Sequence, residues 1–228
     1  YKSVQKKILI TGGSGLLAIN WAQKIKCNYQ VTLALHHRIV SINGVKTIDI
    51  KKITKYPPSS FDIVINTIGL TSVEVCEEDP NLAYETNVKT VINIANFCKG
   101  SNIKLVHIST DHLFDGMQSY YSEVDKPIPL NIYAKTKLAF EAALKTYTDD
   151  LCINTFKLFS LFGEKDNPKL LPLIIKKSLT NQTITLSEGL QKLDFIYAKD
   201  VVNAYLKGIE RMNKTSYQAE YEVFNLGS

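Results

Sequence analysis

A threonine, a tyrosine and a lysine have the types and the spacing needed for proton transfer. Tyr133 and Lys137 are four residues apart in a predicted helix over residues 131–147, so both side chains lie on one helix face. The pKa of a free phenol is about 10, which is high for proton exchange at neutral pH, and a neighbouring ammonium lowers it. Thr110 directly follows a predicted strand over residues 103–109, and its hydroxyl can hold a carbonyl or alcohol oxygen beside the phenol. These three residues predict a general acid–base site.

A glycine-rich turn near the start of the chain predicts a cofactor site that Tyr133 and Lys137 could serve. The predicted strand over residues 7–11 runs into Gly12-Gly13-Ser14-Gly15, and a predicted helix continues to about residue 25. Gly12 permits a tight turn, and Gly15 lets backbone N–H groups approach a phosphate where the helix dipole favours anions. Ala18 supplies the small side chain that close packing of helix on strand requires. A turn of this kind, between the first strand and helix of a βαβ unit, predicts a dinucleotide site.

The residues after the second predicted strand bear on the choice of dinucleotide. An NAD-selective site usually has an acidic residue there, to bind the ribose 2′-hydroxyl. Here the strand over residues 30–35 ends in His36, His37 and Arg38, which can instead hold a 2′-phosphate, so NADP is favoured over NAD. A solvated loop is the alternative interpretation of these three residues. Asp49 can face the adenine amino group or be a simple turn residue.

The elements that must position these residues alternate along the chain. Apolar runs of strand length alternate with segments of helical period, which is typical of a parallel sheet covered by helices on both faces. The right-handed crossover rule then predicts an α/β fold with a doubly wound, Rossmann-type parallel sheet. Besides the elements given above, we expect strands over residues 46–50, 61–66 and 151–158 and a helix over residues 79–97.

The pattern changes after residue 160. We expect a helix over residues 168–179, a strand over 183–186, a helix over 198–212 and a strand over 222–226. The chain is therefore divided into a dinucleotide-binding domain over residues 1–160 and a partial substrate-binding region over residues 161–228, with an approximate boundary.

Composition and charge argue against several other classes of protein. Hydrophobic residues make up 45% and charged residues 21% of the 228 residues, as in globular rather than disordered proteins. The net charge of +5 is spread along the chain, so we expect an anionic small substrate and no nucleic acid. The sequence contains neither a run of about 18 apolar residues nor a signal-peptide pattern, so we expect no membrane span and a cytoplasmic location.

Three further features are expected to be structural. The four cysteines, at positions 27, 76, 98 and 152, are widely spaced and predict neither a disulfide framework nor a metal site. The acidic residues between positions 74 and 79 are expected in a loop before a helix, where they suit the helix N-terminus. Trp21 is expected to pack against the sheet or an adjoining surface.

Five segments together resemble the extended short-chain dehydrogenase/reductase family. Within that family the chain is most similar to the dTDP-4-dehydrorhamnose reductase and nucleotide-sugar epimerase branch. The segments are Thr11–Ala18 (TGGSGLLA), Asn66–Thr71 (NTIGLT), Val106–Gly116 (VHISTDHLFDG), Pro129–Lys137 (PLNIYAKTK) and Asp194–Val201 (DFIYAKDV).

The resemblance implies a role for each matching position. Thr110, Tyr133 and Lys137 would be catalytic, with Tyr133 exchanging the proton and Lys137 tuning it while holding the nicotinamide ribose. Together with His36, Arg38 and Asp49, the implied cofactor-binding residues are Gly12, Gly15, Leu16, Leu17, Thr67, Ile68, Gly69, Ser109 and Lys137; the implied substrate-binding residues are Thr71, Asn87 and Asp111.

The activity that the resemblance implies is NAD(P)-dependent reduction of a 4-keto group on a nucleotide-linked sugar, in the synthesis of a surface polysaccharide. Asp194–Tyr197 is more similar to epimerases and dehydratases, so that activity stays open, as does a non-catalytic, nucleotide-binding regulatory subunit. Lys157 and Ser160 lie where rhamnose reductases more often have Arg and Trp, which leaves the sugar open. For assembly we consider a homodimer. The family usually continues beyond the turn at residues 225–228, so the substrate region is expected to be incomplete.

Overall fold

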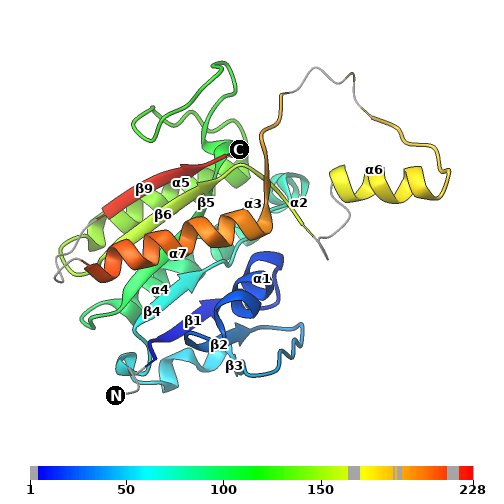
Figure 1. Cartoon of the computed structure of the whole chain (residues 1–228). Coiled ribbons are helices and arrows are strands. Elements are labelled where there is room, and N and C mark those ends of the chain that lie inside the picture. Colours follow the sequence, from blue (N-terminus) through cyan, green and yellow to red (C-terminus); the bar gives the residue numbers. More distant parts are fainter. Residues whose placement is uncertain (1–4, 164–169, 187, 189–191, 215–220, 228) are drawn as a thin grey trace.

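A seven-stranded parallel sheet forms the centre of the molecule (Figure 1). The computed structural model describes residues 5–163, 170–186, 188, 192–214 and 221–227. The strand order is β3-β2-β1-β4-β5-β6-β9, and every neighbouring pair is parallel. The order reverses between β1 and β4, which confirms the predicted doubly wound, Rossmann-type fold. The strands are β1 (Lys7–Thr11), β2 (Gln30–Leu35), β3 (Lys46–Asp49), β4 (Ile63–Asn66), β5 (Lys104–Thr110), β6 (Ile153–Leu158) and β9 (Tyr221–Leu226).

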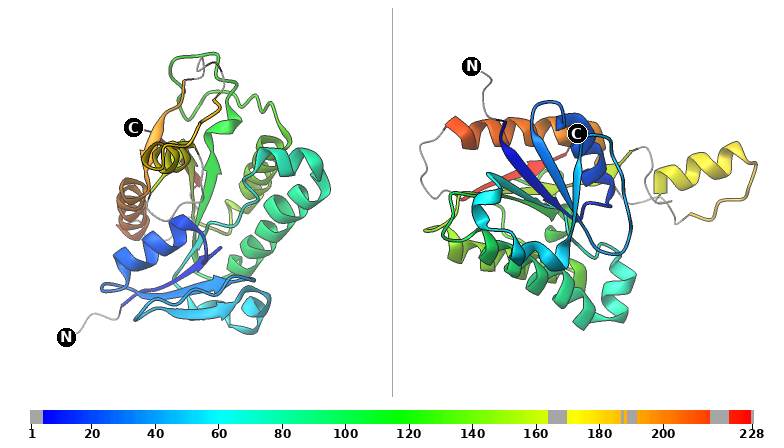
Figure 2. Two further views of the ribbon diagram at one scale, coloured as in Figure 1. Left: turned by 90° about the vertical axis from the view of Figure 1, so that its right-hand side faces the viewer. Right: turned by 90° about the horizontal axis from the view of Figure 1, so that it is seen from below.

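Two layers of helices cover the sheet (Figure 2). Helices α1 (Leu16–Ile25) and α7 (Ala198–Lys214) lie on one face, and α4 (Thr90–Cys98) and α5 (Ile132–Leu144) lie on the other. The expected packing of Trp21 is found between α1 and α7, where its ring stacks on Tyr205 with centroids 4.2 Å apart. Every residue of β4 and β6 is buried, as a central strand covered on both faces requires.

Side-chain alternation along β1 shows how the two cores form. Ile8 and Ile10 point to the face under α1 and α7, whereas Leu9 points to the face under α4. All three side chains are fully buried. Burial of such a side chain contributes about 1.5–3 kcal/mol, so the strand is fixed in register by its packing on both faces.

The predicted helix over residues 79–97 is interrupted. It begins as α3 (Pro80–Tyr84), continues as a π-helical segment over Glu85–Lys89 and ends as α4. The acidic residues before it do not lie in a loop, as we expected, because Val73–Glu78 forms the short helix α2. Asp79 separates α2 from α3, and its side chain accepts a hydrogen bond from the backbone N–H of Leu82, a standard N-cap.

The region after residue 160 differs from the prediction. A second, two-stranded parallel sheet joins β7 (Ser160–Phe162) to β8 (Phe195–Tyr197). The predicted strand over residues 183–186 is wrong, since this mostly exposed segment pairs with no strand in the part of the chain that the structure describes. Helix α6 (Leu170–Leu179) stands away from the main sheet in Figure 1, and the predicted start at residue 168 lies outside the described residues.

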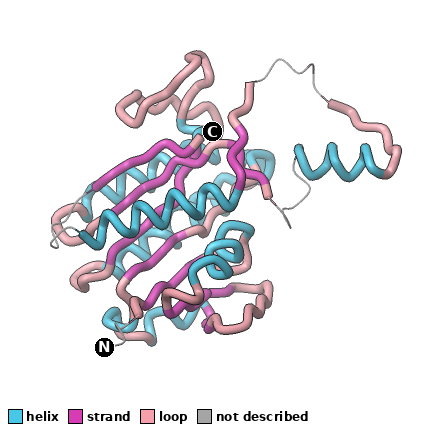
Figure 3. Tube along the Cα trace, viewed as in Figure 1, coloured by secondary structure: helices cyan, strands magenta, loops and turns pink. Residues whose placement is uncertain are grey.

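Long loops follow the carboxyl ends of the central strands. After β5 comes the short 3₁₀ turn η4 (Asp111–Leu113), and residues 114–131 then form a loop without helix or strand, drawn in pink in Figure 3. Within the described residues, none of the helices has the length and apolar character needed to cross a bilayer.

Candidate functional site

The glycine turn after β1 is built by close backbone contacts. Gly12 has φ +68°, and a Cβ there would lie 2.7 Å from Thr67 Oγ1 and 3.0 Å from the Ile68 backbone nitrogen. Gly13 has equally little space, because a Cβ would lie 2.8 Å from Leu33 Cβ, a constraint the sequence did not reveal. The turn is closed by a hydrogen bond of 2.9 Å from Gly15 N to Gly12 O. Gly12 is therefore required by the turn, as predicted.

The N-terminus of α1 is open to an anion. Gly15 is its N-cap residue and provides no side chain to bind the first-turn N–H groups, and the first turn carries no acidic residue. The free N–H groups and the helix dipole both favour negative charge at this position. These are the features that a bound pyrophosphate would use.

A groove of about 1040 Å³ extends from this turn. Its walls include Gly12, Gly15 and His36 on one side and the loop over residues 67–69 on another, with α4 completing it. Arg38 does not line this groove but an adjoining cavity of about 250 Å³, which also contacts Ser14, Leu16 and Lys199. Asp49 lines neither, because its carboxylate accepts a hydrogen bond from the Lys51 backbone N–H and caps the 3₁₀ turn Ile50–Lys55.

A second cavity of about 370 Å³ shares the loop Thr67, Ile68 and Gly69 with the groove as part of its wall. The carboxyl ends of β5 and β6 form part of its wall, and α5 closes one side. Leu17 of the first helix reaches it too. The predicted site residues that line it are Leu17, Thr67, Ile68, Gly69, Thr71, Ser109, Thr110, Asp111, Tyr133 and Lys137.

The three expected catalytic residues meet in this second cavity. Helix α5 begins at an Asn131 N-cap, whose side chain accepts a 2.8 Å hydrogen bond from Ala134 N, so Tyr133 and Lys137 occupy its first two turns. Lys137 Nζ donates to the Ile108 carbonyl at 2.5 Å. Thr110 Oγ1 accepts from the His112 N–H and donates to Asp111, each at 3.2 Å. Thr110, Tyr133 and Lys137 are 4%, 7% and 4% exposed, so each has been largely removed from water.

Burial controls the charges of the site. It raises the pKa of Tyr133 to about 12, although a hydrogen bond with Thr110 acts in the opposite direction. Burial also lowers the pKa of Lys137 to about 8, which the negative charge of Glu141 opposes. We expected the Lys137 ammonium to lower the pKa of Tyr133, and in this structure burial outweighs any such effect. The pKa of Asp111 is raised, mainly by burial, against the opposing charge of His112.

Asn87 does not line the cavity that holds the catalytic residues, although we expected it to contact substrate. Its side chain accepts a 2.7 Å hydrogen bond from the Leu70 N–H and donates to the Leu70 carbonyl at 3.1 Å. It also donates to Thr136 Oγ1 at 3.0 Å. Asn87 thus ties the loop after β4 to α5 from behind the site.

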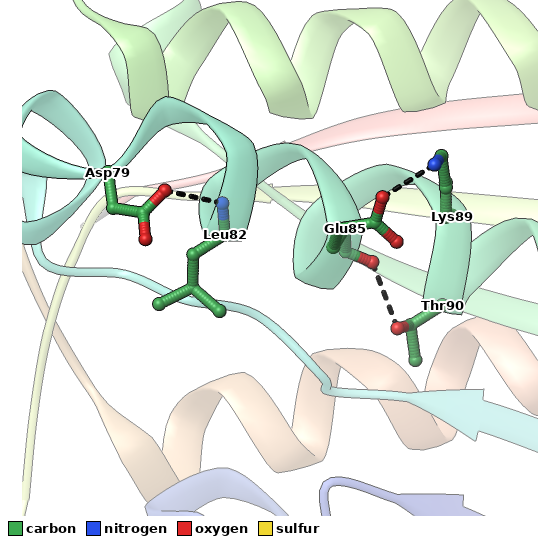
Figure 4. Close-up of polar contacts among 5 residues, drawn as sticks. All are labelled: Asp79, Leu82, Glu85, Lys89 and Thr90. Atoms are coloured by element: carbon green, nitrogen blue, oxygen red, sulfur yellow. Dashed lines mark hydrogen bonds and ion pairs between the residues drawn. The ribbon is translucent and has the colours of Figure 1, made fainter.

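The π-helical segment places Asn87 in this position. The Thr90 backbone N–H and hydroxyl both contact the Glu85 carbonyl, five residues earlier, and Lys89 forms an ion pair with Glu85 (Figure 4). The wider turn inserts one extra residue into the helix, a feature that is frequent near functional sites. Periodicity alone could not have revealed it.

Replacing Asn87 with alanine is expected to destabilise the protein. The backbone N–H and C=O of Leu70 and the hydroxyl of Thr136 would lose their partner, at about 1–3 kcal/mol for each group left buried and unpaired. Thermal unfolding should show a melting temperature lower by several degrees, at about 2–4 °C per kcal/mol. The control Asn93→Ala removes an exposed asparagine six residues further along. An equal shift in both variants would contradict the role given to Asn87.

No group of three or more His, Cys, Asp or Glu side chains that could hold a metal ion occurs among the described residues. His107 is fully buried, and its Nδ1 lies 3.1 Å from Asn66 Nδ2. Burial lowers the pKa of His107 well below its usual value, so the imidazole is neutral at pH 7.

The sheet order and the glycine turn define a class of protein, the doubly wound α/β proteins of Rossmann type. A model of the family described as "RmlD substrate binding domain" matches residues 6–227, and the chain belongs to that family. The resemblance to the extended short-chain dehydrogenase/reductases, in their dTDP-4-dehydrorhamnose reductase branch, is thereby confirmed.

Similar proteins include a CDP-abequose synthase from Salmonella muenchen, 29% identical over 95% of this chain and 75% of that protein. A dTDP-4-dehydrorhamnose reductase from Aggregatibacter actinomycetemcomitans is 32% identical over 69% of this chain and 53% of its own length. Among solved structures, a UDP-glucuronic acid 4-epimerase from Bacillus cereus, in complex with UDP-glucuronic acid and NAD, superposes with a TM-score of 0.86. At 23% identity, over 97% of this chain and 77% of that one, it supports the fold alone.

Proposed function

We propose that the protein reduces a keto group on a nucleotide-linked sugar, with NADPH or NADH as the hydride donor. The observation that carries the proposal is the cavity in which Thr110, Tyr133 and Lys137 meet, because one loop forms part of its wall and part of the wall of the groove at the glycine turn. The similarity to an abequose synthase and a dehydrorhamnose reductase supports a nucleotide-linked 4-keto sugar as the substrate.

The residues present fit a dinucleotide. Gly12 leaves space that any side chain would fill, and the N-terminus of α1 presents free N–H groups for a pyrophosphate. Leu16 and Leu17 follow in the first turn of that helix. The groove of about 1040 Å³ is large enough for an extended ligand, since pockets for drug-sized molecules are about 300–1000 Å³.

In the proposed mechanism the keto carbon gains a hydride and the keto oxygen gains a proton, so that C=O becomes CH–OH. A bound reduced nicotinamide supplies the hydride. Tyr133 donates its hydroxyl proton to the oxygen. The Thr110 hydroxyl, which donates to Asp111 in the free protein, turns to donate a hydrogen bond to the same oxygen. The high pKa of Tyr133 keeps the phenol protonated at neutral pH, which is the form that reduction requires. Lys137, held by the Ile108 carbonyl, supplies positive charge beside the phenolate that forms.

Cofactor oxidation tests the proposal. The full-length protein would be offered 4-keto nucleotide sugars with NADPH and NADH in parallel. Oxidation that depends on the sugar would support a reductase. If the protein instead retained nicotinamide tightly and converted the sugar without net cofactor oxidation, the result would favour an epimerase or dehydratase. Binding of a partner enzyme with neither reaction would favour a regulatory subunit.

We expect Arg38 to favour NADPH over NADH. In Arg38→Gln the 2′-phosphate would lose a charge-assisted partner worth about 1.5–3 kcal/mol, so NADPH should bind roughly 10- to 100-fold more weakly and NADH almost unchanged. Fluorescence titration of each reduced cofactor measures both affinities directly. Arg211→Gln is the matched control, because it removes the same charge from an arginine that contacts Glu222 instead. Equal weakening of NADPH and NADH in Arg38→Gln would remove the argument for a 2′-phosphate site.

A further inference from the structure

A group of buried polar atoms lies under α5, behind the cavity that holds the catalytic residues. None of the four makes a hydrogen bond of standard geometry within the described part of the chain, and each belongs to a side chain that the mechanism above does not use. The atoms are Glu141 Oε1, His107 Nε2, Thr155 Oγ1 and the Tyr221 hydroxyl oxygen.

Strand register brings these side chains to one face of the sheet. His107 on β5 pairs with Thr155 on β6, so their side chains point the same way. Tyr221 on β9 pairs with Ile153, two residues before Thr155 and therefore also on this face. The ring of Phe140 contacts His107 at 4.4 Å, which places α5 directly above the group.

The groups of this cluster also affect one another electrostatically. Burial is the main cause that raises the pKa of Tyr221 to about 12, and the negative charge of Glu141 adds to the rise. A hydrogen-bonding contact with the Thr155 side chain, outside standard geometry, opposes it. Burial lowers the pKa of His107, and the positive charge of Lys137 lowers it further. Each residue of the group is therefore near at least one of the others or Lys137.

Unpaired polar atoms at this depth cost about 1–3 kcal/mol each. Natural proteins meet such a cost with buried water, which makes about three hydrogen bonds to polar atoms that would otherwise be unpaired. Donors and acceptors from α5, β5, β6 and β9 surround this place, so it suits ordered water between Glu141 and the two hydroxyl groups.

Glu141 is also one helical turn from Lys137. The two residues are four apart in α5 and so share a helix face, and they are 5% and 4% exposed. The other titratable groups of the site are poorer counter-ions for a Lys137 ammonium. His107 and Tyr133 are neutral at pH 7, and the pKa of Asp111 is raised. Lys157 on β6 is buried too, with its Nζ over the ring of Phe114, and carries no carboxylate.

We propose that Glu141 is a positioning residue, a buried counter-charge that keeps Lys137 protonated, and that Tyr221 and Thr155 hold its carboxylate through buried water. The inference rests on the proposed function, in which the Lys137 ammonium stabilises the phenolate of Tyr133. Loss of the carboxylate charge would make the ammonium less favourable, so the pKa of Lys137 would fall. As the pH is raised, activity would then be lost at a lower pH than in the unmodified protein.

The test is a titration of Lys137 in Glu141→Gln, which keeps the size of the side chain. NMR of protein labelled at lysine ¹³Cε, with the Lys137 signal assigned by Lys137→Arg, follows this lysine without any turnover. We expect the titration midpoint of Lys137 to fall by about one pH unit, a tenfold change in its protonation equilibrium. The alkaline limb of the pH profile of kcat/KM should move to lower pH by the same amount. Activity at pH values below this limb should be unchanged. Unchanged titration in Glu141→Gln would overturn the proposal.

A second variant keeps the proposal testable if Glu141→Gln does not fold. Tyr221→Phe removes one hydroxyl around the carboxylate and should shift the Lys137 titration in the same direction by a smaller amount. Tyr205→Phe is its matched control, since it removes another buried, unpaired hydroxyl on the opposite face of the sheet, against Trp21. Equal shifts in the two tyrosine variants would overturn the proposal. Because the NMR titration needs no substrate, failure of the reductase activity alone would not be confused with failure of this inference.

Discussion

Tyr133→Phe is expected to lower turnover by about 10²- to 10⁴-fold, the usual contribution of a positioned general acid. The substitution removes only the hydroxyl, and the phenyl ring stays in the small core that Tyr133 forms with Cys76 and Ala83. The affinity for reduced cofactor should therefore stay nearly unchanged. Steady-state kinetics with a 4-keto nucleotide sugar, together with fluorescence titration of the cofactor, measure the two quantities separately.

A matched tyrosine makes this prediction sharper. Tyr147→Phe removes a hydroxyl that donates to Asn96 at 2.7 Å, at the far end of α5 and outside the cavity. Its turnover should equal that of the unmodified protein. Near-normal turnover in Tyr133→Phe would exclude Tyr133 as the proton donor. The cavity beside the groove would then have no catalytic role.

The parts of the site that could be predicted from sequence are set by local geometry. Four residues in a helix make one turn, so Tyr133 and Lys137 had to share a face once α5 formed. The turn at Gly12 follows from the positive φ that glycine alone adopts easily. Thr110 was placed by a rule of topology, because the carboxyl ends of parallel strands meet at one edge of the sheet.

The features that sequence did not reveal depend on contacts between distant segments. Strands β7 and β8 have only three residues each and are paired across more than thirty residues of chain. Thr183–Leu186 has the composition of a strand, but it pairs with no strand among the described residues. A short strand is stabilised by its neighbour rather than by its own residues. The prediction at residues 183–186 therefore failed although the residue types favoured it.

Charge and hydrogen-bond partners were the least predictable properties. The family resemblance implied that Asn87 contacts substrate, but a π-helical turn directs its side chain to the Leu70 backbone. Likewise the expected effect of Lys137 on Tyr133 assumed that both groups are in contact with water. Burial of each group changes both pKa values more than their proximity does, and burial becomes known only when the surrounding layers are in place.

Gly12→Ala is expected to abolish cofactor binding and to destabilise the protein. A non-glycine residue at φ +68° costs about 1–2 kcal/mol, and the added Cβ would lie 2.7 Å from Thr67 Oγ1, adding about 1–3 kcal/mol of overpacking. The same contact would push the glycine turn away from the loop at residues 67–68. Because these two segments are walls of the groove, the groove would be distorted. Calorimetry and cofactor titration measure both effects.

Gly44→Ala separates strain from steric contact in this prediction. Gly44 has φ +80°, similar to Gly12, but a Cβ there would meet no atom within 4 Å. Gly44→Ala should therefore show only the conformational cost of about 1–2 kcal/mol, a fall in melting temperature of roughly 2–4 °C per kcal/mol, and unchanged cofactor affinity. If Gly12→Ala behaved like Gly44→Ala, the close approach of Thr67 would not limit residue 12, and the phosphate would have to bind elsewhere in the groove.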